Sequence, residues 1–257
     1  MCELLGVTAN TKIKMNELFK IFFSHSEEHR NGWGLVLLDD DVFSIDKEPK
    51  KAIDSLYLKS KLKDNIETAR CIAHIRKATI GEVNVNNTHP FLKNDDSGRR
   101  WVLAHNGTIF ESEALSPYQY IQEGTTDSER ILLYIVDEIN KLYQKKHDLL
   151  NEKERIGIVE EAIKTIVPGN KLNLLIFDGD LLYVHKNEAG TLYKKELKEG
   201  MIFSTQPLDE NGWLELPQNQ LLVYKSGNLV HIGQKHNSSY IHSEERMKLL
   251  YLAYSEL

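Results

Sequence analysis

The second residue of the chain is a cysteine, and its position allows an unusual kind of nucleophile. Cys2 is small enough for the initiating Met1 to be removed ahead of it, which would leave a thiol and a free α-amine on one residue. An α-amine with a pKa of about 7.7 to 8.0 can act as a base toward its own thiol. Cys2 is therefore a candidate nucleophile, and the alternative is a small core residue, as most lone cysteines are.

A histidine and an arginine occupy the end of a short strand-like run. If residues 71–76 form a strand, His74 and Arg76 share a face, because side chains alternate with a period of two. An arginine at a strand end can hold a carboxylate through two parallel hydrogen bonds. The alternative for Arg76 is a surface position or a structural ion pair.

An Asn-Gly pair follows a second strand-like run at residues 101–105. The side-chain amide of Asn106 and the backbone N–H of Gly107 could together stabilise a developing oxyanion. The same dipeptide is common in plain turns, and spacing alone leaves both interpretations open.

An acidic residue lies where a helix is expected to begin. Thr126 and Glu129 have the spacing of a capping box, which puts Asp127 in the first helical turn. The Asp127 carboxylate could also bind the ammonium group of a ligand.

The other polar residues give no sign of a metal or nucleotide site. The histidines at 25, 29, 74, 89 and 105 lack the spacing of HExxH or of Cys/His fingers. Neither GxxxxGK[ST] nor GxGxxG occurs. We therefore expect no metal and no cofactor.

The elements that must position these residues come in blocks of strands, helices and strands. Hairpin-length connections favour antiparallel pairing over a βαβ arrangement, so we predict an α+β fold of antiparallel sheets covered by helices. The predicted strands are 4–8, 33–38, 42–45, 70–76, 101–105, 174–177, 181–185, 201–204, 220–224 and 229–232. The predicted helices are 15–23, 49–63, 127–145, 152–167 and a segment from residue 242. The charged segment 93–98 is either a mobile lid or a solvated surface loop.

Composition excludes several classes of protein. The 257 residues are 41% hydrophobic and 27% charged, which is typical of a globular chain. The net charge of -6 provides no basic field for nucleic acid or an anionic membrane. The chain has neither a long apolar run nor a secretion signal, so we expect a cytoplasmic protein with Cys2 and Cys71 as free thiols.

Together these motifs resemble the glutaminase domain of class II glutamine amidotransferases, which are N-terminal-nucleophile hydrolases. The similarity is closest to their small stand-alone branch, and it lies in the order and approximate spacing of the motifs along nearly the whole chain. The segments that carry it are residues 1–6, 31–34, 74–81, 87–91, 105–107, 126–129 and 204–208, with Trp213.

The resemblance implies a four-layer αββα sandwich and a single class II glutamine amidotransferase domain over residues 2–257. Cys2 would attack the side-chain amide of glutamine with its own α-amine as base, forming a γ-glutamyl thioester and releasing ammonia. The oxyanion hole, the site for the α-carboxylate and the site for the α-ammonium would surround the bound glutamine. The implied residues are the catalytic Cys2, Asn106 and Gly107, the carboxylate-binding Arg76, the ammonium-binding Asp127, and Thr79 and His89 near the pocket.

The resemblance leaves the substrate and the fate of the ammonia open. Larger members of the family continue into a domain that uses ammonia, so we expect either a separate synthase subunit or plain hydrolysis. Some stand-alone relatives cleave γ-glutamyl peptides or thiol conjugates, which is the first alternative. The second is a non-catalytic glutamine-sensing subunit, against which the presence of Cys2, Asn106 and Gly107 argues.

Overall fold

The computed structural model describes residues 2–40, 42–78 and 81–255 and contains two antiparallel sheets. The first sheet consists of β1 (Glu3–Lys14), β2 (Trp33–Leu38), β3 (Phe43–Glu48), β4 (Glu67–Ile75), β9 (Tyr193–Glu196), β10 (Gly200–Ser204) and β11 (Trp213–Glu215). The second consists of β5 (Phe91–Asn94), β6 (Arg100–Thr108), β7 (Lys171–Phe177), β8 (Leu181–His185), β12 (Leu222–Lys225) and β13 (Asn228–Ile232). Their strand orders are β11-β9-β10-β1-β4-β2-β3 and β13-β12-β8-β7-β6-β5.

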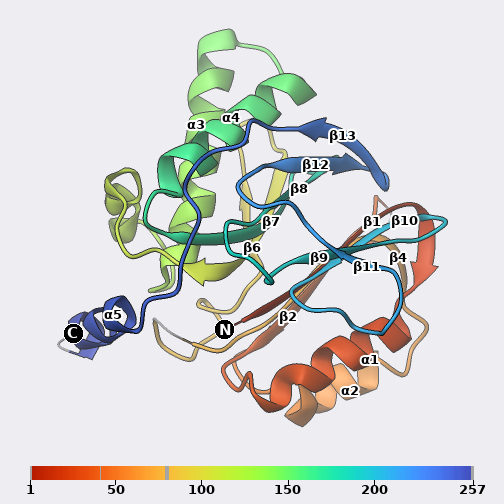
Figure 1. Ribbon diagram of the computed structural model, residues 1–257. Helices are drawn as coiled ribbons and strands as arrows, with labels where there is room; N and C mark the ends of the chain where they lie inside the picture. Colours follow the sequence, from red (N-terminus) through yellow and green to blue (C-terminus); the bar gives the residue numbers. More distant parts are fainter. Residues whose placement is uncertain (1, 41, 79–80, 256–257) are drawn as a thin grey trace.

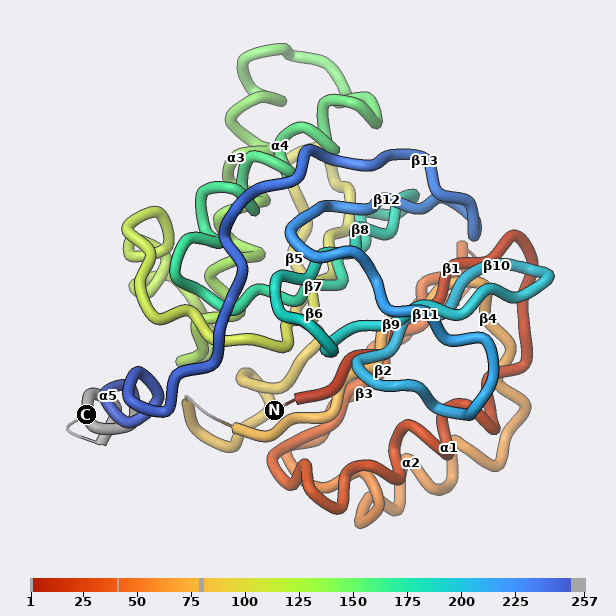
Figure 2. The backbone as a smooth tube through the Cα atoms, viewed as in Figure 1, coloured from red at the N-terminus to blue at the C-terminus, as the bar shows by residue number. Residues whose placement is uncertain are grey.

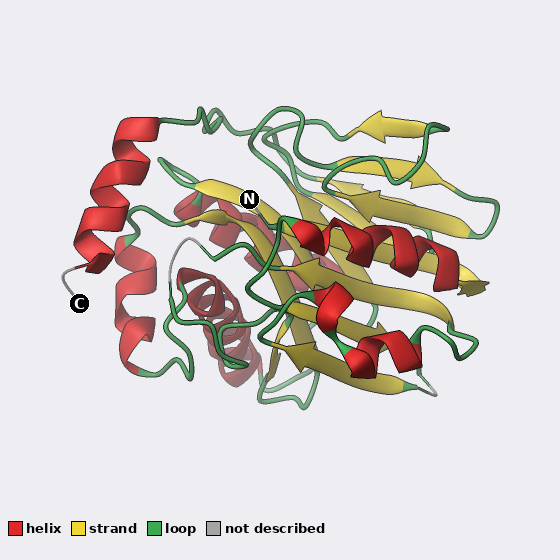
Figure 3. Ribbon diagram, turned by 90° about the horizontal axis from the view of Figure 1, so that it is seen from below, coloured by secondary structure: helices red, strands yellow, loops and turns green. Residues whose placement is uncertain are grey.

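Helices cover the outer faces of both sheets, which confirms the predicted four-layer α+β sandwich (Figure 1). On the first sheet lie α1 (Asn16–Ser24) and α2 (Leu56–Lys61), which Figure 3 shows from below, across the strands. On the second lie α3 (Asp127–Lys146) and α4 (Glu152–Ile166). The remaining helices are η1 (His25–Glu27), η2 (Ala52–Asp54), η3 (Glu113–Tyr120) and α5 (Glu244–Ser255).

The alternation of side chains along β1 explains why this strand can lie between two apolar layers. Leu5 and Val7 pack in the same cluster as Phe19 and Phe22 of α1, while Leu4 packs in the cluster between the sheets. All five side chains are almost completely buried, and each contributes roughly 1.5 to 3 kcal/mol of burial free energy. The N-terminal strand is therefore fixed from both faces, and it begins at the end of the sheet nearest to α5 (Figure 1).

Sequence periodicity predicted the long elements and missed the short ones. The helices α1, α3 and α4 and the strand β8 lie where they were expected. The strands β5, β9 and β11 and the helix η3 were not predicted. Three of these four, β5, β9 and β11, are strands of three or four residues at or next to a sheet edge. Most of their side chains are at least partly exposed, so apolar and polar residues show little alternation along them.

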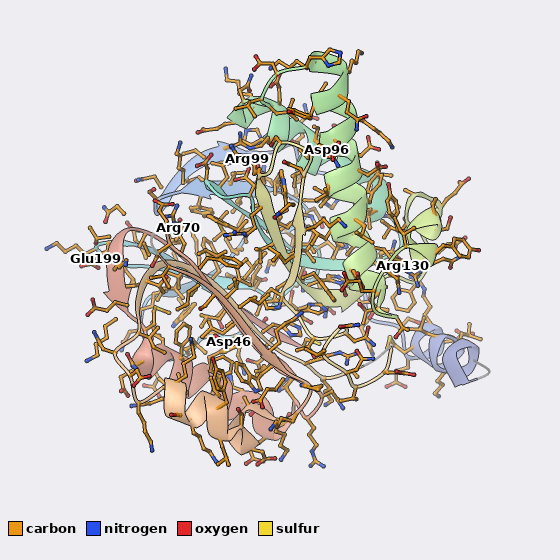
Figure 4. The ribbon with its side chains drawn as sticks, turned by 180° about the vertical axis from the view of Figure 1, so that it is seen from behind. Asp46, Arg70, Asp96, Arg99, Arg130 and Glu199 are labelled. Carbon is orange, nitrogen blue, oxygen red and sulfur yellow. The ribbon has the colours of Figure 1, made fainter. Side chains whose placement is uncertain are left out.

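The lid proposed for residues 93–98 is wrong, because this segment is the turn of the β5–β6 hairpin. The Asp95 carboxylate accepts hydrogen bonds from the backbone N–H groups of Ser97 and Arg99. The hairpin end is attached to the C-terminal half of α3, where Asn140 accepts from the backbone N–H of Asp96. Figure 4 shows Asp96 there, next to α3. This point is about 20 Å along the helix from Asp127, at 1.5 Å per residue.

The C-terminal segment runs from β13 along the side of the second sheet to α5, as Figure 2 shows. His236 lies 2.9 Å from His185, and the side-chain amide of Asn187 donates to the carbonyl of Ser238. These contacts hold the segment against β8. In the part of the chain that the structure describes, no helix combines the length and apolarity needed to cross a membrane.

The close approach of β2 to the segment at His89 requires a glycine at position 34. A methyl group on Gly34 would overlap the backbone carbonyl of His89. We predict that Gly34→Ala lowers the free energy of unfolding by about 2 kcal/mol or more, because the segment carrying His89 must move. Denaturant unfolding followed by fluorescence measures this change.

The matched control is Gly157→Ala, since Gly157 lies in α4 and a methyl group there meets no neighbouring atom. This change should raise the free energy of unfolding by about 0.5 to 1 kcal/mol through helix propensity. Equal midpoints for Gly34→Ala and the natural protein would contradict the close-packing argument.

Candidate active site

A single small cavity collects five of the seven residues implied by the resemblance. Its volume is about 30 Å³. It is lined by Cys2, Arg76, His89, Gly107 and Asp127, together with Lys77, Ala78, His105, Thr108, Thr126 and Ser128. Asn106, which precedes the lining residue Gly107 in β6, is buried, and Thr79 lies outside the described residues. Residues that are distant in sequence therefore meet at the start of β1.

Hydrogen bonds on both sides fix the strand that carries Cys2. The backbone N–H of Leu4 donates to the Thr205 hydroxyl at 2.8 Å, and the backbone N–H of Thr205 donates to the carbonyl of Leu4 at 3.0 Å. The Glu3 carboxylate accepts from Gln206 at 2.8 Å and lies 2.9 Å from His25. The position of the thiol is therefore set by the sheet and not by a free chain end.

The thiol of Cys2 lies against the backbone of Lys77, with its sulfur 3.4 Å from both the N–H and the carbonyl oxygen of that residue. Burial raises the pKa of this thiol, and the Lys77 N–H and the Arg76 guanidinium lower it, whereas the Asp127 carboxylate raises it further. Protonated Cys2 is thus a poor nucleophile on its own. Chemistry at this sulfur needs a base to remove the proton.

Asn106 and Gly107 belong to β6 and face the start of β1. The amide nitrogen of Asn106 lies 3.5 Å from the Thr205 hydroxyl, so Thr205 contacts both Asn106 and the N-terminal strand. A side chain at position 107 would overlap the carbonyl oxygen of Lys171 and the His105 ring. Asn-Gly is therefore part of a strand beside Cys2, and the plain-turn interpretation is wrong.

Arg76 follows β4 and is 97% buried, so it is not a surface residue. Its Nη1 donates to the carbonyl of Glu82 at 2.8 Å and its Nη2 to that of Gly81 at 3.3 Å. Asn87 donates to the same Glu82 carbonyl and to Thr125, and it accepts from the Thr125 N–H. Arg76 and Asn87 thereby attach the segment after Gly81 to the residues that precede α3.

Asp127 begins α3 as predicted, but the capping box does not form. Glu129 accepts hydrogen bonds from the backbone N–H groups of Glu123 and Gly124, not from Thr126. The Thr126 side chain makes no capping hydrogen bond. The Asp127 Oδ2 atom instead accepts from the backbone N–H of Ile109 at 2.7 Å. The first turn of α3 is thus connected to neighbouring loops rather than closed on itself.

Three buried histidines lie at the cavity: His89 and His105 line it, and His74 stacks on His89. The rings of His74 and His89 stack 4.2 Å apart, and the His89 Nδ1 accepts from the backbone N–H of His105 at 3.1 Å. Burial lowers the pKa of all three imidazoles, so they are neutral in the folded chain. Because the unfolded chain takes up these protons below about pH 6.5, the three histidines reduce stability in acid.

The tautomer of His105 follows from its two partners. Its Nε2 lies 3.0 Å from the Lys171 carbonyl, which can only accept, so Nε2 carries the hydrogen. Its Nδ1 is therefore an acceptor, and the Ser128 hydroxyl lies 2.9 Å away to donate to it. The Ser128 hydroxyl is also 3.2 Å from the Asp127 Oδ1. His105 and Ser128 thereby connect β7 to the start of α3.

A buried lysine near Cys2 was not predicted. Lys171 pairs in register with Thr108 and forms an ion pair with Glu188. Burial lowers the pKa of Lys171, while the Glu188 carboxylate and the negative charge of ionised Cys2 raise it. Ser128 and Thr205 were missed as well. Both lie within the segments 126–129 and 204–208 that carry the resemblance, but neither was given a role.

The described residues contain no group of three or more His, Cys, Asp or Glu side chains arranged to hold a metal ion. Cys2 and Cys71 are free thiols in the structure, as predicted. Cys71 is completely buried in β4, whereas Cys2 is partly exposed.

The charge next to Cys2 gives a prediction for its thiol. We expect Asp127→Asn to lower the pKa of the Cys2 thiol, because the carboxylate that opposes ionisation is removed. The rate of Cys2 alkylation by iodoacetamide, followed by peptide mass mapping, should then reach its midpoint at a lower pH than in the natural protein.

The control is Glu138→Gln, which removes a carboxylate from the solvent side of the same helix. It should leave the midpoint unchanged, with buried Cys71 unlabelled in every sample. A midpoint that stays constant or rises in Asp127→Asn would contradict the electrostatic coupling.

Comparison with known families gives a match over most of the chain. The family model described as glutamine amidotransferases class-II matches residues 1–195. The protein MJ1515 of Methanocaldococcus jannaschii is 29% identical over 266 residues, which cover 91% of this chain and 72% of that protein. A Haemophilus influenzae protein, provisionally named a glutamine amidotransferase, is 29% identical over 88% of this chain and 85% of its own length.

A solved structure supports the same fold. The glutamine phosphoribosylpyrophosphate amidotransferase of B. subtilis superposes with a TM-score of 0.65 at 15% identity, over 91% of this chain and 49% of that chain. At this identity the match concerns the fold alone. It agrees with the two face-to-face antiparallel sheets described above.

Proposed function

This chain belongs to the class II glutamine amidotransferases, and we propose that it hydrolyses the γ-glutamyl amide of glutamine, or of a related γ-glutamyl compound, at Cys2. The observation that carries the proposal is one cavity in which the Cys2 thiol, Arg76, Gly107 and Asp127 meet. A nucleophile, an anion-binding group and a cation-binding group at one small site suit a zwitterionic substrate with a reactive amide.

Opposite charges orient the substrate in this proposal. The Arg76 guanidinium binds the α-carboxylate, the Asp127 carboxylate binds the α-ammonium, and His89 lines the pocket beside them. With both ends of the amino acid held, the side-chain amide is delivered to the sulfur in a reactive geometry. Arg76 and Asp127 belong to different layers of the sandwich, so the folded sheets preorganise this recognition.

The chemical step uses the free amine of the mature chain. The α-amine of Cys2 takes the thiol proton, and the sulfur attacks the amide carbon. The Asn106 amide and the Gly107 N–H donate to the resulting oxyanion. The tetrahedral intermediate collapses to a γ-glutamyl thioester as the amine returns the proton to the leaving nitrogen. Water then hydrolyses the thioester to glutamate.

The first test measures glutamate release from glutamine and from a panel of γ-glutamyl peptides and thiol conjugates. Release should occur with the natural protein and be lost in Cys2→Ala, because the sulfur that would form the thioester is removed. The panel identifies the preferred leaving group. Cys71→Ala, which removes the second thiol, should retain activity.

Intact mass spectrometry of the same samples tests whether the α-amine of Cys2 is free to act as the base. The natural protein and Cys2→Ala should both lack Met1, since a retained methionine would block the α-amine. Activity that persists in Cys2→Ala would refute the mechanism. Inactivity of the natural protein toward the whole panel would favour a glutamine-sensing subunit, or one that needs an ammonia-using partner.

The oxyanion hole gives a second prediction. Asn106→Ala should lower kcat by about 100- to 1000-fold with a small effect on KM, because the amide hydrogen bond strengthens in the transition state. The control is Asn228→Ala, since Asn228 lies in the exposed strand β13. If Asn106→Ala raised KM and left kcat unchanged, Asn106 would be assigned to substrate binding instead.

A further inference from the structure

The hydroxyl of Thr126 is a buried polar group with no hydrogen-bond partner among the described residues. Thr126 is 3% exposed and precedes α3, where a threonine usually accepts a hydrogen bond from the helix backbone. Its Oγ1 makes neither this bond nor another with any residue that the structure describes. Thr126 is one of the residues that line the Cys2 cavity.

An unpaired buried hydroxyl destabilises a fold, and a valine of the same shape would avoid that cost. The neighbouring Thr125 shows the ordinary arrangement, since its hydroxyl accepts from the Asn87 side chain at 2.9 Å. An unpaired group at an otherwise well-bonded helix start therefore indicates a partner that arrives with the ligand.

The surroundings indicate the chemistry of that partner. The carboxylate of Asp127 lines the same cavity as Thr126 and attracts a ligand cation, whereas Arg76, which also lines it, is the group to which the proposed function assigns the anion. A primary ammonium has three N–H donors, which one carboxylate oxygen does not satisfy. The Asp127 Oδ2 is already occupied by the Ile109 N–H. The Ser128 hydroxyl, 3.2 Å from Oδ1, donates to His105, so Oδ1 is the one carboxylate oxygen left for the ammonium. A second acceptor is thus needed beside Asp127.

We propose that the Thr126 hydroxyl accepts a hydrogen bond from the α-ammonium of the substrate, next to Asp127. Thr126 is then a specificity-determining residue that selects an α-amino acid over the same acid without its amine. This inference rests on the proposed function for the identity of the substrate. It goes beyond the proposed function by assigning recognition of the α-ammonium to two side chains, those of Asp127 and Thr126.

The test compares Thr126→Val with the natural protein on two ligand pairs. Hydrolysis is measured with glutamine and with glutaramic acid, which lacks the α-amine. Binding of L-glutamate and of glutarate is measured by titration calorimetry, which requires no turnover. The valine variant should lose about 10-fold or more in kcat/KM for glutamine and in affinity for L-glutamate. For glutaramic acid and glutarate the change should stay below about 2-fold.

Two controls separate recognition from a structural effect. Thr126→Val should unfold at the same or a higher denaturant concentration, because it removes an unpaired hydroxyl from a buried position. Thr126→Ser should restore the preference for the amine. Thr165→Val, which makes the same change on the outside of α4, should leave both ligand pairs unaffected.

Other results would overturn the inference. Equal losses with and without the α-amine would show a structural role. Thr126→Val could lower kcat/KM for glutaramic acid, which keeps the α-carboxylate, but not for 4-aminobutanamide, which lacks it. That result would assign Thr126 to recognition of the carboxylate. Absence of L-glutamate binding to the natural protein would also refute it. If the natural protein binds L-glutamate but hydrolyses no substrate, the proposed function is refuted. The role of Thr126 is then decided by the affinities of Thr126→Val for L-glutamate and for glutarate.

Discussion

The arrangement depends on the hydrogen bonds that hold the first residues of the chain inside a sheet. Leu4 exchanges two hydrogen bonds with Thr205, and the same threonine hydroxyl contacts the amide of Asn106 in the facing sheet. A chain terminus is ordinarily the most mobile part of a protein. Here it is a central strand, with apolar clusters on both faces. The thiol of Cys2 is therefore positioned as accurately as a side chain in the middle of a strand.

The layer between the sheets changes character along its length. Toward the far end it is filled by side chains such as Val36, Leu175 and Phe203. Toward Cys2 it contains Arg76, Lys171 and neutral histidines, all buried. Burying so many polar groups costs stability, and the large apolar clusters elsewhere offset that cost. The fold thus concentrates its least stable packing at the place where the chemistry is proposed.

Local signals predicted antiparallel sheets covered by helices, and the resemblance of the short motifs to the family predicted the four layers and most of the cavity residues. Periodic apolar residues define α3 and α4, and the short motifs bring Cys2, Arg76, Gly107 and Asp127 to one place. The role of Glu129 was wrong, since spacing identifies a capping box but does not reveal that Gly124 competes for the carboxylate. The ion pair of Lys171 depends on contacts between residues far apart in sequence. No periodic pattern predicts such contacts.

The hydrogen bonds of Asn87 have a consequence for how this site can diversify. Through Asn87, the segment that holds Arg76 and the segment that leads into Asp127 form one continuous wall. The two groups proposed to recognise the glutamyl end therefore move together, and a change to one disturbs the other. Asn106 lies on β6 and Lys171 on β7, both in the second sheet, whereas Arg76 follows β4 of the first sheet. A duplicated copy of this protein could thus acquire a new leaving group while still recognising the same acyl donor.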